Sequence, residues 1–354
     1  MERRIKEVLG IEFDELENIV SERNKSIVDI VIRDGCNLNC NQCFAGKQKI
    51  ANFDMGKIKD IVGKYPNVFL YPLEITVSKN IDEILTLMKE TKRRRVLTNG
   101  VALNEDILNK LWSYGIRELS IGNFEGADDE TQKMITGESA TREKTIRGIK
   151  YALQKGFKVG VYTVVSKANN RKAEEIVKLA YELNVSSIRF YRFLPVGNGR
   201  NISELAMSTE ETEEFILSVL NLRKKFKDKI RISLGASFGP DLYSKSTLEY
   251  LANPNSASKY VCYAASPGYI AIEPLTDTDI FYPCFMAAGE KKLARNSRFE
   301  DFDINKLKGE CGKCAYKKIC GGGCRMVAYA LTGDFYESMD VCVTKVREKY
   351  GMFD

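Results

Sequence analysis

Short apolar runs alternate with longer amphipathic segments through the first two thirds of the chain. The segment at 81–88 repeats apolar residues at helical spacing, as do others between the runs. Two helix starts have the signature of a capping box, Asn80 with Glu83 and Ser208 with Glu211. The apolar runs are β-branched or aromatic and of strand length. They lie at residues 26–33, 68–71, 96–98, 118–121, 159–165 and 187–193.

Strands and helices that follow one another in this order predict a parallel sheet with right-handed connections, which is an α/β fold. A helix at 209–226 and a strand at 230–234 follow the sixth unit. The length favours a partial, open (β/α)6 barrel of the TIM type over a closed barrel of eight strands. The predicted organisation is an N-terminal extension at 1–25, the barrel at 26–234, a linker with a short helix at 235–260, and a small cysteine-rich domain at 261–354.

Composition places the chain among ordinary globular proteins. Of its 354 residues, 44% are hydrophobic and 29% are charged, and no apolar run reaches the roughly 18 residues that a membrane span needs. The first residues are charged and lack the apolar core of a signal peptide, so we expect a cytoplasmic protein without a membrane partner. A net charge of +6, without a stacking platform or recognition motif, makes nucleic acid an unfavoured partner.

Cysteine and histidine usage narrows the chemistry. Ten cysteines in a reducing compartment are expected to be metal ligands or redox groups before they are disulfides. The chain has no histidine, so proton transfers would fall to Asp, Glu, Lys, Tyr, Cys or water. The sequence does not assign a catalytic acid or base among these.

Three cysteines, Cys36, Cys40 and Cys43, form a C-x3-C-x2-C loop directly after the first predicted strand. Three thiolates leave one iron of a [4Fe-4S] cluster without a protein ligand, and an open iron can bind a cosubstrate. Barrel folds place their chemistry at this end of a strand. The alternatives are zinc and a buried or disulfide-bonded trio. A zinc site would need a fourth ligand, and the next cysteine is Cys262.

The loop and its position resemble the radical S-adenosylmethionine (SAM) superfamily. The resemblance implies that the open iron binds the amino and carboxylate groups of the methionine moiety of SAM. Reductive cleavage would then yield a 5′-deoxyadenosyl radical, with a flavodoxin or ferredoxin-type protein as electron donor. The superfamily usually has an aromatic residue before the third cysteine, whereas here Gln42 occupies that place and Phe44 follows the cysteine.

The resemblance also assigns cosubstrate contacts to the ends of the following strands. Residues 71–74 stand where the superfamily has Gly-Gly-Glu-Pro, with Glu74 expected to face the methionine ammonium. The segment 193–197 resembles the one that packs the adenine. The simpler interpretation of each position is a turn or a core contact. The predicted cosubstrate residues are Gln42, Phe44, Tyr71, Leu73, Glu74, Thr98, Asn99, Ser120 and Leu194.

The other seven cysteines lie near the carboxyl terminus and include a C-x2-C-x5-C-x3-C run with glycines at 321–323. This pattern resembles a SPASM domain, a module that binds auxiliary iron-sulfur clusters, although Asp279 replaces a family glycine. The resemblance implies two auxiliary clusters, expected to be [4Fe-4S], while four-cysteine zinc sites are the alternative. The distal cluster would be held by Cys311, Cys314, Cys320 and Cys342, and the proximal cluster by only three cysteines, Cys262, Cys284 and Cys324.

The two modules together imply an oxidoreductase that removes a hydrogen atom from an unactivated carbon. Proteins with this pairing mostly modify peptides, so we expect a peptide or protein substrate and a thioether or carbon-carbon crosslink in a ribosomally synthesised peptide. Few residues precede the first strand, so a separate protein could bind the leader peptide.

Three other functions fit the same residues. One is oxidation of a protein side chain, as by sulfatase maturases, which would need a carboxylate base near the substrate. Another is oxidation of a small molecule in a haem or sugar pathway. The third is a non-catalytic iron-sulfur electron carrier, which would not need the set formed by Glu74, Ser120 and Leu194. Epimerisation is less favoured because the three sets of ligands leave no cysteine spare.

Overall fold

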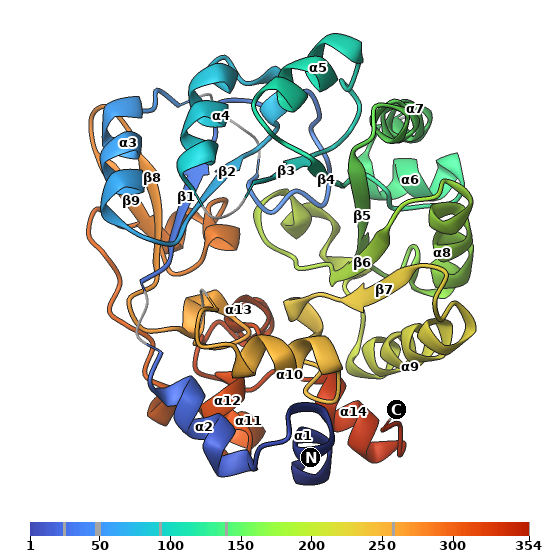
Figure 1. Cartoon of the computed structure of the whole chain (residues 1–354), viewed down its shortest axis with the longest axis vertical. Coiled ribbons are helices and arrows are strands. Elements are labelled where there is room, and N and C mark those ends of the chain that lie inside the picture. The colour runs from blue at the N-terminus through green and yellow to red at the C-terminus, as the bar shows by residue number, and fades with distance from the viewer. Residues whose placement is uncertain (24–25, 47–50, 92–93, 139–140, 257–258, 354) are drawn as a thin grey trace.

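The computed structural model describes residues 1–23, 26–46, 51–91, 94–138, 141–256 and 259–353. Strands at the centre are surrounded by helices (Figure 1). The strands are β1 (Val28–Ile32), β2 (Val68–Pro72), β3 (Arg95–Thr98), β4 (Glu118–Ile121), β5 (Lys158–Val165), β6 (Ser187–Arg192), β7 (Arg231–Leu234), β8 (Ile270–Pro274) and β9 (Asp279–Tyr282).

The helices occupy the segments between strands and both ends of the chain. They are α1 (Glu2–Leu9), α2 (Phe13–Ser21), α3 (Met55–Lys64), α4 (Ile81–Glu90), α5 (Glu105–Ser113), α6 (Asp129–Thr136), α7 (Thr141–Gln154), α8 (Ala173–Glu182), α9 (Thr209–Lys225), α10 (Lys245–Ala252), α11 (Gly309–Lys313), α12 (Lys317–Cys320), α13 (Arg325–Thr332) and α14 (Val343–Lys349).

The strands form two sheets, in the orders β2-β1-β8-β9 and β3-β4-β5-β6-β7. All neighbouring strands are parallel except the antiparallel hairpin of β8 and β9. The strands follow one another round an arc that stays open (Figure 1). The predicted partial α/β barrel is therefore confirmed. The barrel strands do not form one continuous sheet, because β2 and β3 are not hydrogen-bonded to each other.

Alternation along the strands separates the core from the barrel interior. In β5, Val159, Val161 and Val165 are buried in the core that the sheets share with the helices, whereas Tyr162 on the opposite face is partly exposed. The ring of Tyr162 meets that of Tyr191 on β6 edge to face, with centroids 6.0 Å apart. The interior of the barrel is therefore lined by aromatic rings at this point.

The carboxyl-terminal segment shares a sheet with the barrel. β8 lies beside β1, with Val28 opposite Ile270. The helices α1 and α2 pack on α10 and α12 through Ile5, Leu16 and Ile319, which belong to one buried cluster. Figure 1 shows these helices gathered at one end of the molecule. The division of the chain at residue 260 stays a prediction, because both sides of it contribute strands to the first sheet.

The two predicted capping boxes have different outcomes. Ser208 accepts from the backbone N–H of Glu211, whose side chain accepts from the backbone N–H of Ser208, so this box is confirmed. Asn80 is the N-cap of α4, but its side chain makes no capping hydrogen bond. Its backbone N–H donates instead to Ser78 Oγ at 3.1 Å. The box with Glu83 is therefore wrong, because the turn before α4 is organised by Ser78.

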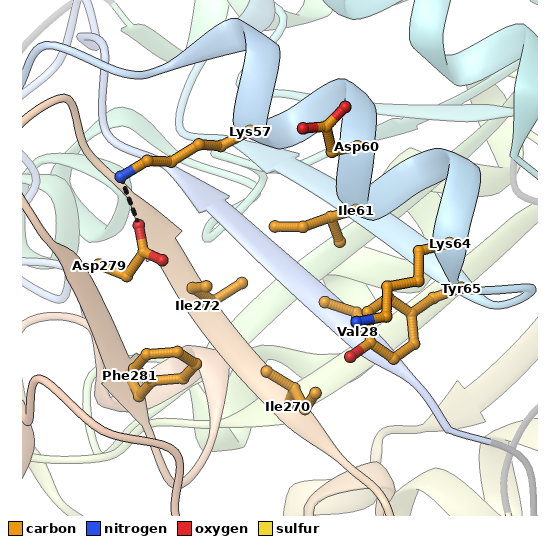
Figure 2. A pocket seen from close by; sticks show the side chains of 10 residues that line it. All are labelled: Val28, Lys57, Asp60, Ile61, Lys64, Tyr65, Ile270, Ile272, Asp279 and Phe281. Atoms are coloured by element: carbon orange, nitrogen blue, oxygen red, sulfur yellow. Dashed lines mark hydrogen bonds and ion pairs between the residues drawn. The ribbon is translucent and has the colours of Figure 1, made fainter.

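A groove lies on the outer face of the first sheet, between α3 and the β8-β9 hairpin (Figure 2). Ile61, Ile270, Ile272 and other apolar residues line it, and the pair of Lys57 Nζ with Asp279 Oδ1 at 3.0 Å closes one end. None of the cysteines or predicted cosubstrate residues lines this groove. In the described ranges, no helix is both long and apolar enough to cross a bilayer.

Candidate iron-sulfur and cosubstrate site

The cysteine loop begins where β1 ends and is anchored at its base to both flanking strands of the sheet. Arg33 donates from Nε and Nη2 to the carboxylate of Glu273 on β8, at 2.7 Å and 2.6 Å. Tyr282 on β9 donates to the same carboxylate at 2.8 Å. Asp34 is buried and accepts from Ser78, which follows β2. The loop therefore starts from a fixed position.

The end of β6 holds the second half of the loop. Asn198 donates from its backbone N–H to the carbonyl of Cys43 and from Nδ2 to the carbonyl of Cys40, both at 3.0 Å. Gly197 approaches so closely that a Cβ there would lie 2.2 Å from the carbonyl oxygen of Phe44. The loop and the segment after β6 are thus packed backbone to backbone.

The carboxyl end of α6 holds the first half. The backbone N–H of Asn41 donates to the carbonyl of Thr136 at 3.2 Å, and that of Asn39 donates to Glu138 Oε1 at 2.8 Å. The resemblance to the superfamily places Thr136 near a position where an arginine for the SAM carboxylate is expected. Here the residue contacts the loop through its backbone.

All three thiols of the loop are free, with Cys36 exposed and Cys40 and Cys43 partly buried. Although the residue is exposed, the protein around its sulfur removes water and raises the pKa of Cys36 to about 11, and the negative charges of Glu74 and Cys43 add to the effect. Burial also raises the pKa of Cys40, to which Cys43 and Cys36 contribute. The three sulfurs therefore lie close together. Without metal, the raised pKa values keep the thiols protonated, whereas bound iron would stabilise the deprotonated thiolates.

This donor set fits a cluster better than a single ion. Within the described residues, no three or more Cys, Asp, Glu or His side chains converge as they would around one metal ion. A [4Fe-4S] cluster binds each cysteine through a different iron, so its ligands are spaced more widely. The choice between a cluster and zinc in this loop stays a prediction.

Glu74 is buried at 1% exposure and joins the two sheets where the ladder is interrupted. Its Oε1 accepts from Thr98 Oγ1 at 2.6 Å and from Thr76 Oγ1 at 2.7 Å, and its Oε2 accepts from the backbone N–H of Asn99 at 2.6 Å. Burial raises the pKa of Glu74 despite these hydrogen bonds. The carboxylate therefore holds the end of β3 beside β2, and its role toward a methionine ammonium stays a prediction.

Asn99 extends from that contact to the cysteine loop. Its Nδ2 donates to Asn37 Oδ1 at 2.7 Å and lies 3.7 Å from Cys36 Sγ. The structure therefore brings together Glu74, Thr98, Asn99 and Cys36. Ser120 has a partly exposed side chain on the neighbouring strand β4.

Aromatic rings join the loop to the carboxyl-terminal region. Tyr71 stacks on Phe285 with centroids 4.6 Å apart and an interplanar angle of 3°. Phe44 meets Phe285 edge to face at 5.9 Å. Leu194 is buried in the same apolar cluster, which also contains Cys284 and Cys324. Leu73 continues the β1-β2 ladder, since its backbone N–H donates to the carbonyl of Ile32 at 3.1 Å.

Gln42 faces a carboxylate that the sequence analysis did not single out. Its Nε2 donates to Glu125 Oε1 at 3.2 Å, while Glu125 Oε2 accepts from the backbone N–H of Val164 at 2.6 Å. Glu125 is buried at 1% exposure, and burial raises its pKa to about 8. Burial and the charges of Glu125 and Glu74 also raise the pKa of Tyr162. Tyr162 therefore lies near both carboxylates.

Three residues of this site, Glu125, Tyr162 and Asn198, were missed by the sequence analysis. Glu125 follows the fourth predicted strand, and Asn198 follows the segment 193–197, so position at a strand end was the available signal. Tyr162 lies inside a strand and carried no signal, because alternation does not tell which face lines the barrel.

The carboxyl-terminal cysteines differ in burial, and their division between two clusters stays a prediction. Cys262, Cys284 and Cys324 are buried. A hydrogen bond with Cys324 lowers the pKa of Cys262, and the backbone N–H and positive charge of Arg325 act in the same direction. Burial and the neighbouring Cys262 raise the pKa of Cys284. These three sulfurs are therefore close to one another.

The remaining four cysteines form a separate, partly buried group. Burial raises the pKa of Cys342 to about 11, with contributions from Cys311 and Cys314. Burial also raises the pKa of Cys320, with contributions from Cys342 and Cys311. The sulfurs thus interact as a set of four, although the binding of clusters by either group stays a prediction.

Comparison with known proteins agrees with this geometry. Residues 30–180 match the model of the radical SAM superfamily. These residues form a radical SAM domain. They include Cys36, Cys40 and Cys43, and the superfamily carries out radical chemistry with a [4Fe-4S] cluster and SAM.

Relatives and solved structures resemble the chain beyond the radical SAM domain. An AdoMet-dependent heme synthase from Methanosarcina barkeri is 26% identical, over 89% of this chain and 95% of its own length. A PqqA peptide cyclase from Granulibacter bethesdensis is 22% identical, over 74% of this chain and 70% of its own. The crystal structure of anSMEcpe with bound AdoMet and a peptide has a TM-score of 0.68 at 16% identity, covering 92% of this chain and 97% of that one. The last comparison shows that the fold is shared across nearly the whole chain.

Proposed function

We propose that this chain is a radical SAM oxidoreductase that removes a hydrogen atom from a carbon of a small molecule of the haem-pathway type and transfers an electron to an auxiliary iron-sulfur cluster. The observation that carries the proposal is the loop of three free cysteines at the end of β1, beside two further groups of cysteines. Three cysteines would leave one iron of the first cluster open to SAM, and the other two groups would hold clusters that accept electrons, so radical generation and electron storage would be separate.

The first cluster would be held by Cys36, Cys40 and Cys43. When bound, this cluster and SAM supply a 5′-deoxyadenosyl radical. The chain's own residues orient and enclose that chemistry: Glu74 fixes Asn99 beside the loop, and Phe44 and the stacked pair of Tyr71 with Phe285 close one side against water. The hydrogen atom taken from the substrate leaves as part of 5′-deoxyadenosine.

The second half of the reaction needs an electron acceptor. The substrate radical must lose one electron to become a closed-shell product, and Cys262, Cys284 and Cys324 would hold a cluster that receives it. Cys284 lies in the apolar cluster that Phe44 and Tyr71 of the barrel contact, so the acceptor would lie close to the barrel. Cys311, Cys314, Cys320 and Cys342 would hold the second auxiliary cluster, which would carry the electron away from the substrate. A flavodoxin or ferredoxin-type protein would donate the electron that reductive SAM cleavage needs.

Two observations support the haem-pathway class of substrate. The heme synthase of M. barkeri is matched over nearly its full length, whereas the peptide cyclase is matched over 70% of its length. The tyrosine rings of Tyr162 and Tyr191 line the barrel interior, and aromatic faces suit a flat conjugated molecule. Sequence analysis alone favoured a peptide because it weighed only the pairing of the two modules.

Peptide crosslinking is the second candidate function. It is favoured by the predicted proximal ligands Cys262, Cys284 and Cys324, because a cluster with three thiolate ligands would have an iron open to a substrate thiolate. A separate protein could then present the leader peptide.

The test combines metal content with turnover. Anaerobically reconstituted protein should contain about twelve irons per chain and cleave SAM reductively. Carboxylated tetrapyrroles and synthetic cysteine-containing peptides are then supplied in parallel, with 5′-deoxyadenosine and product masses followed together. Product formed one-to-one with 5′-deoxyadenosine from a tetrapyrrole would support the first proposal, and a crosslinked peptide would replace it with the second. A protein that contains iron but does not cleave SAM would contradict both proposals and support a non-catalytic electron carrier.

A further inference from the structure

The interior face of β6 carries a cation beside the aromatic rings of the barrel. Ile188 and Phe190 are buried on the outer face, where the ring of Phe190 meets that of Phe215 on α9 with centroids 5.4 Å apart. Because side chains alternate along a strand, Arg189 and Tyr191 share the interior face. They are two residues apart, which in a strand is roughly 6.6 Å.

The register of the sheet places two more side chains beside Arg189. Tyr162 on β5 lies opposite Arg189 on one side, and Ser233 on β7 lies opposite it on the other. Neighbouring strands are about 4.8 Å apart, so these three side chains form one layer across the sheet. A single small molecule can therefore contact all of them.

Two glycines at strand ends leave room for the aromatic rings. A Cβ at Gly122, after β4, would lie 2.4 Å from the ring of Tyr162. A Cβ at Gly235, after β7, would lie 2.4 Å from the ring of Tyr191. Each ring thus lies directly against backbone, in a place that any larger residue would obstruct. The two rings form an aromatic surface whose position the flanking strands fix.

Arg189 is oriented at one end of its guanidinium only. Its Nε donates to Ser233 Oγ at 3.1 Å. In the part of the chain that the structure describes, no residue accepts from its Nη1 or Nη2. Arg95, on the interior face of β3, differs because its Nε and Nη2 both donate to Glu118, at 3.3 Å and 2.9 Å. Arg189 therefore offers two terminal donors, which match the two oxygens of a carboxylate.

The charges on this face favour an anion. Arg231 lies on the interior face of β7, and the described residues provide no carboxylate that pairs with it or with Arg189. On the interior face of β3 to β7 the only acidic residue is Glu118, which pairs with both Arg95 and Lys158. The excess of positive charge raises the local concentration of acidic ligands.

We propose that Arg189, Tyr162 and Tyr191 form the binding site for a flat conjugated acid, with Arg189 as the residue that selects its carboxylate. This inference rests on the proposed function, because it locates the substrate of that reaction. The tyrosine rings contact the conjugated face of the molecule. Tyr191 lies nearer than Arg189 to the carboxyl ends of the strands, where the cysteine loop begins. A substrate held by its acid at Arg189 therefore extends past the rings toward that loop.

The test is equilibrium binding of two probes to the full, anaerobically reconstituted chain, followed by porphyrin fluorescence. Protoporphyrin IX is a flat dicarboxylic acid, and its dimethyl ester has the same ring without the charges. R189Q and R189A remove the charge of Arg189 with side chains of different size, and R189K keeps it. R147Q is the matched control, because it removes an exposed arginine from α7, outside the barrel (Figure 1).

Wild type, R189K and R147Q should bind the acid at least about tenfold more tightly than the ester. R189Q and R189A should bind acid and ester alike, since a charge-assisted contact to the carboxylate is lost. A preference that persists in both variants would overturn the inference, as would a wild-type chain that shows no preference or binds neither probe.

Y191L tests the aromatic part of the site. It should weaken binding of the acid and of the ester severalfold and to the same extent, because it removes a ring without changing the charge. Unchanged affinity for both probes would show that Tyr191 is not part of the site.

Turnover separates this inference from the proposed function. A tetrapyrrole acid that is converted with the same KM by wild type and R189Q would contradict only the role of Arg189. A crosslinked peptide, formed by a chain that converts no tetrapyrrole, would contradict both.

Discussion

The two groups of three cysteines in this chain have opposite environments. Cys36 is exposed, and its loop is held by backbone contacts from the ends of β6 and α6. Cys262, Cys284 and Cys324 are buried, and the sulfur of Cys262 faces a backbone N–H and a cation. The first group is partly accessible at the surface, and the second is enclosed in protein.

The difference shows how one chain can assign different tasks to similar ligands. If clusters bind as proposed, an iron in the loop could exchange its remaining ligand, whereas a cluster held by Cys262, Cys284 and Cys324 would be enclosed by protein and its potential would depend on nearby charges. The aromatic contacts among Phe44, Tyr71 and Phe285 lie between the two groups. The two environments are therefore adjacent and separated by apolar side chains.

The largest expected effect comes from removing either group of cysteines. Replacement of Cys36, Cys40 and Cys43 by Ala should remove about four irons per chain and abolish reductive SAM cleavage, since no open iron remains. Replacement of Cys262, Cys284 and Cys324 should also remove about four irons but leave SAM cleavage in the absence of substrate. Iron analysis and 5′-deoxyadenosine assays measure both. Cleavage that survives the first replacement would contradict the separation of tasks.

The ion pair beneath the loop is expected to have the next largest effect. E273A leaves Arg33 and the hydroxyl of Tyr282 without their partner, in a site where the carboxylate is fully buried. Breaking a buried pair in this way should lower the free energy of unfolding by about 3–5 kcal/mol. D279A is the control on the same hairpin, because its pair with Lys57 is more than one-third exposed and should contribute at most about 1 kcal/mol. Equal effects in chemical denaturation would show that the pair is not an anchor.

Glu125 gives a pH-dependent test of the contact between the loop and the barrel. Burial raises its pKa to about 8, so the folded state keeps the proton to higher pH than the unfolded state does. Its contribution to stability is greatest below the ordinary carboxyl pKa and is lost as pH rises toward about 8. E125Q should therefore gain about 1–3 kcal/mol relative to wild type between about pH 6 and about pH 8.5. The measurement is chemical denaturation of both proteins at the two pH values. The same difference in unfolding free energy between E125Q and wild type at both would contradict the prediction.

The smallest expected effect concerns the aromatic contact between the two groups. F285L removes the stacking partner of Tyr71 and should lower the free energy of unfolding by about 1 kcal/mol beyond the loss of buried area. F335L disrupts a similar stack, with Tyr329 at 4.6 Å, away from the loop. Only F285L should also slow SAM cleavage severalfold. Equal cleavage rates in both variants would show that Phe285 contributes to packing alone.

Local features of this protein could be predicted from its sequence. The alternation in 159–165, the capping box of Ser208 with Glu211 and the spacing of Cys36, Cys40 and Cys43 each depend on residues a few positions apart. Those signals were enough for the open α/β barrel and for the radical SAM domain. The capping box at Asn80 failed because Ser78, two residues earlier, competes for the same backbone.

Contacts between distant segments were decided only by the tertiary structure. The pairing of β8 with β1, the bridge that Glu74 makes between the sheets and the contact of Gln42 with Glu125 join residues that no local pattern relates. The same holds for Arg325, whose position beside Cys324 in the sequence does not indicate that its side chain is fully buried. The sequence by itself determined which candidate ligands exist and approximately where the strands β1 to β7 lie, whereas it did not indicate β8 and β9. Only the tertiary structure decided which charged side chains and sulfurs lie close together. The reason is that electrostatic interactions depend on distance in space and on burial, and not on separation along the sequence.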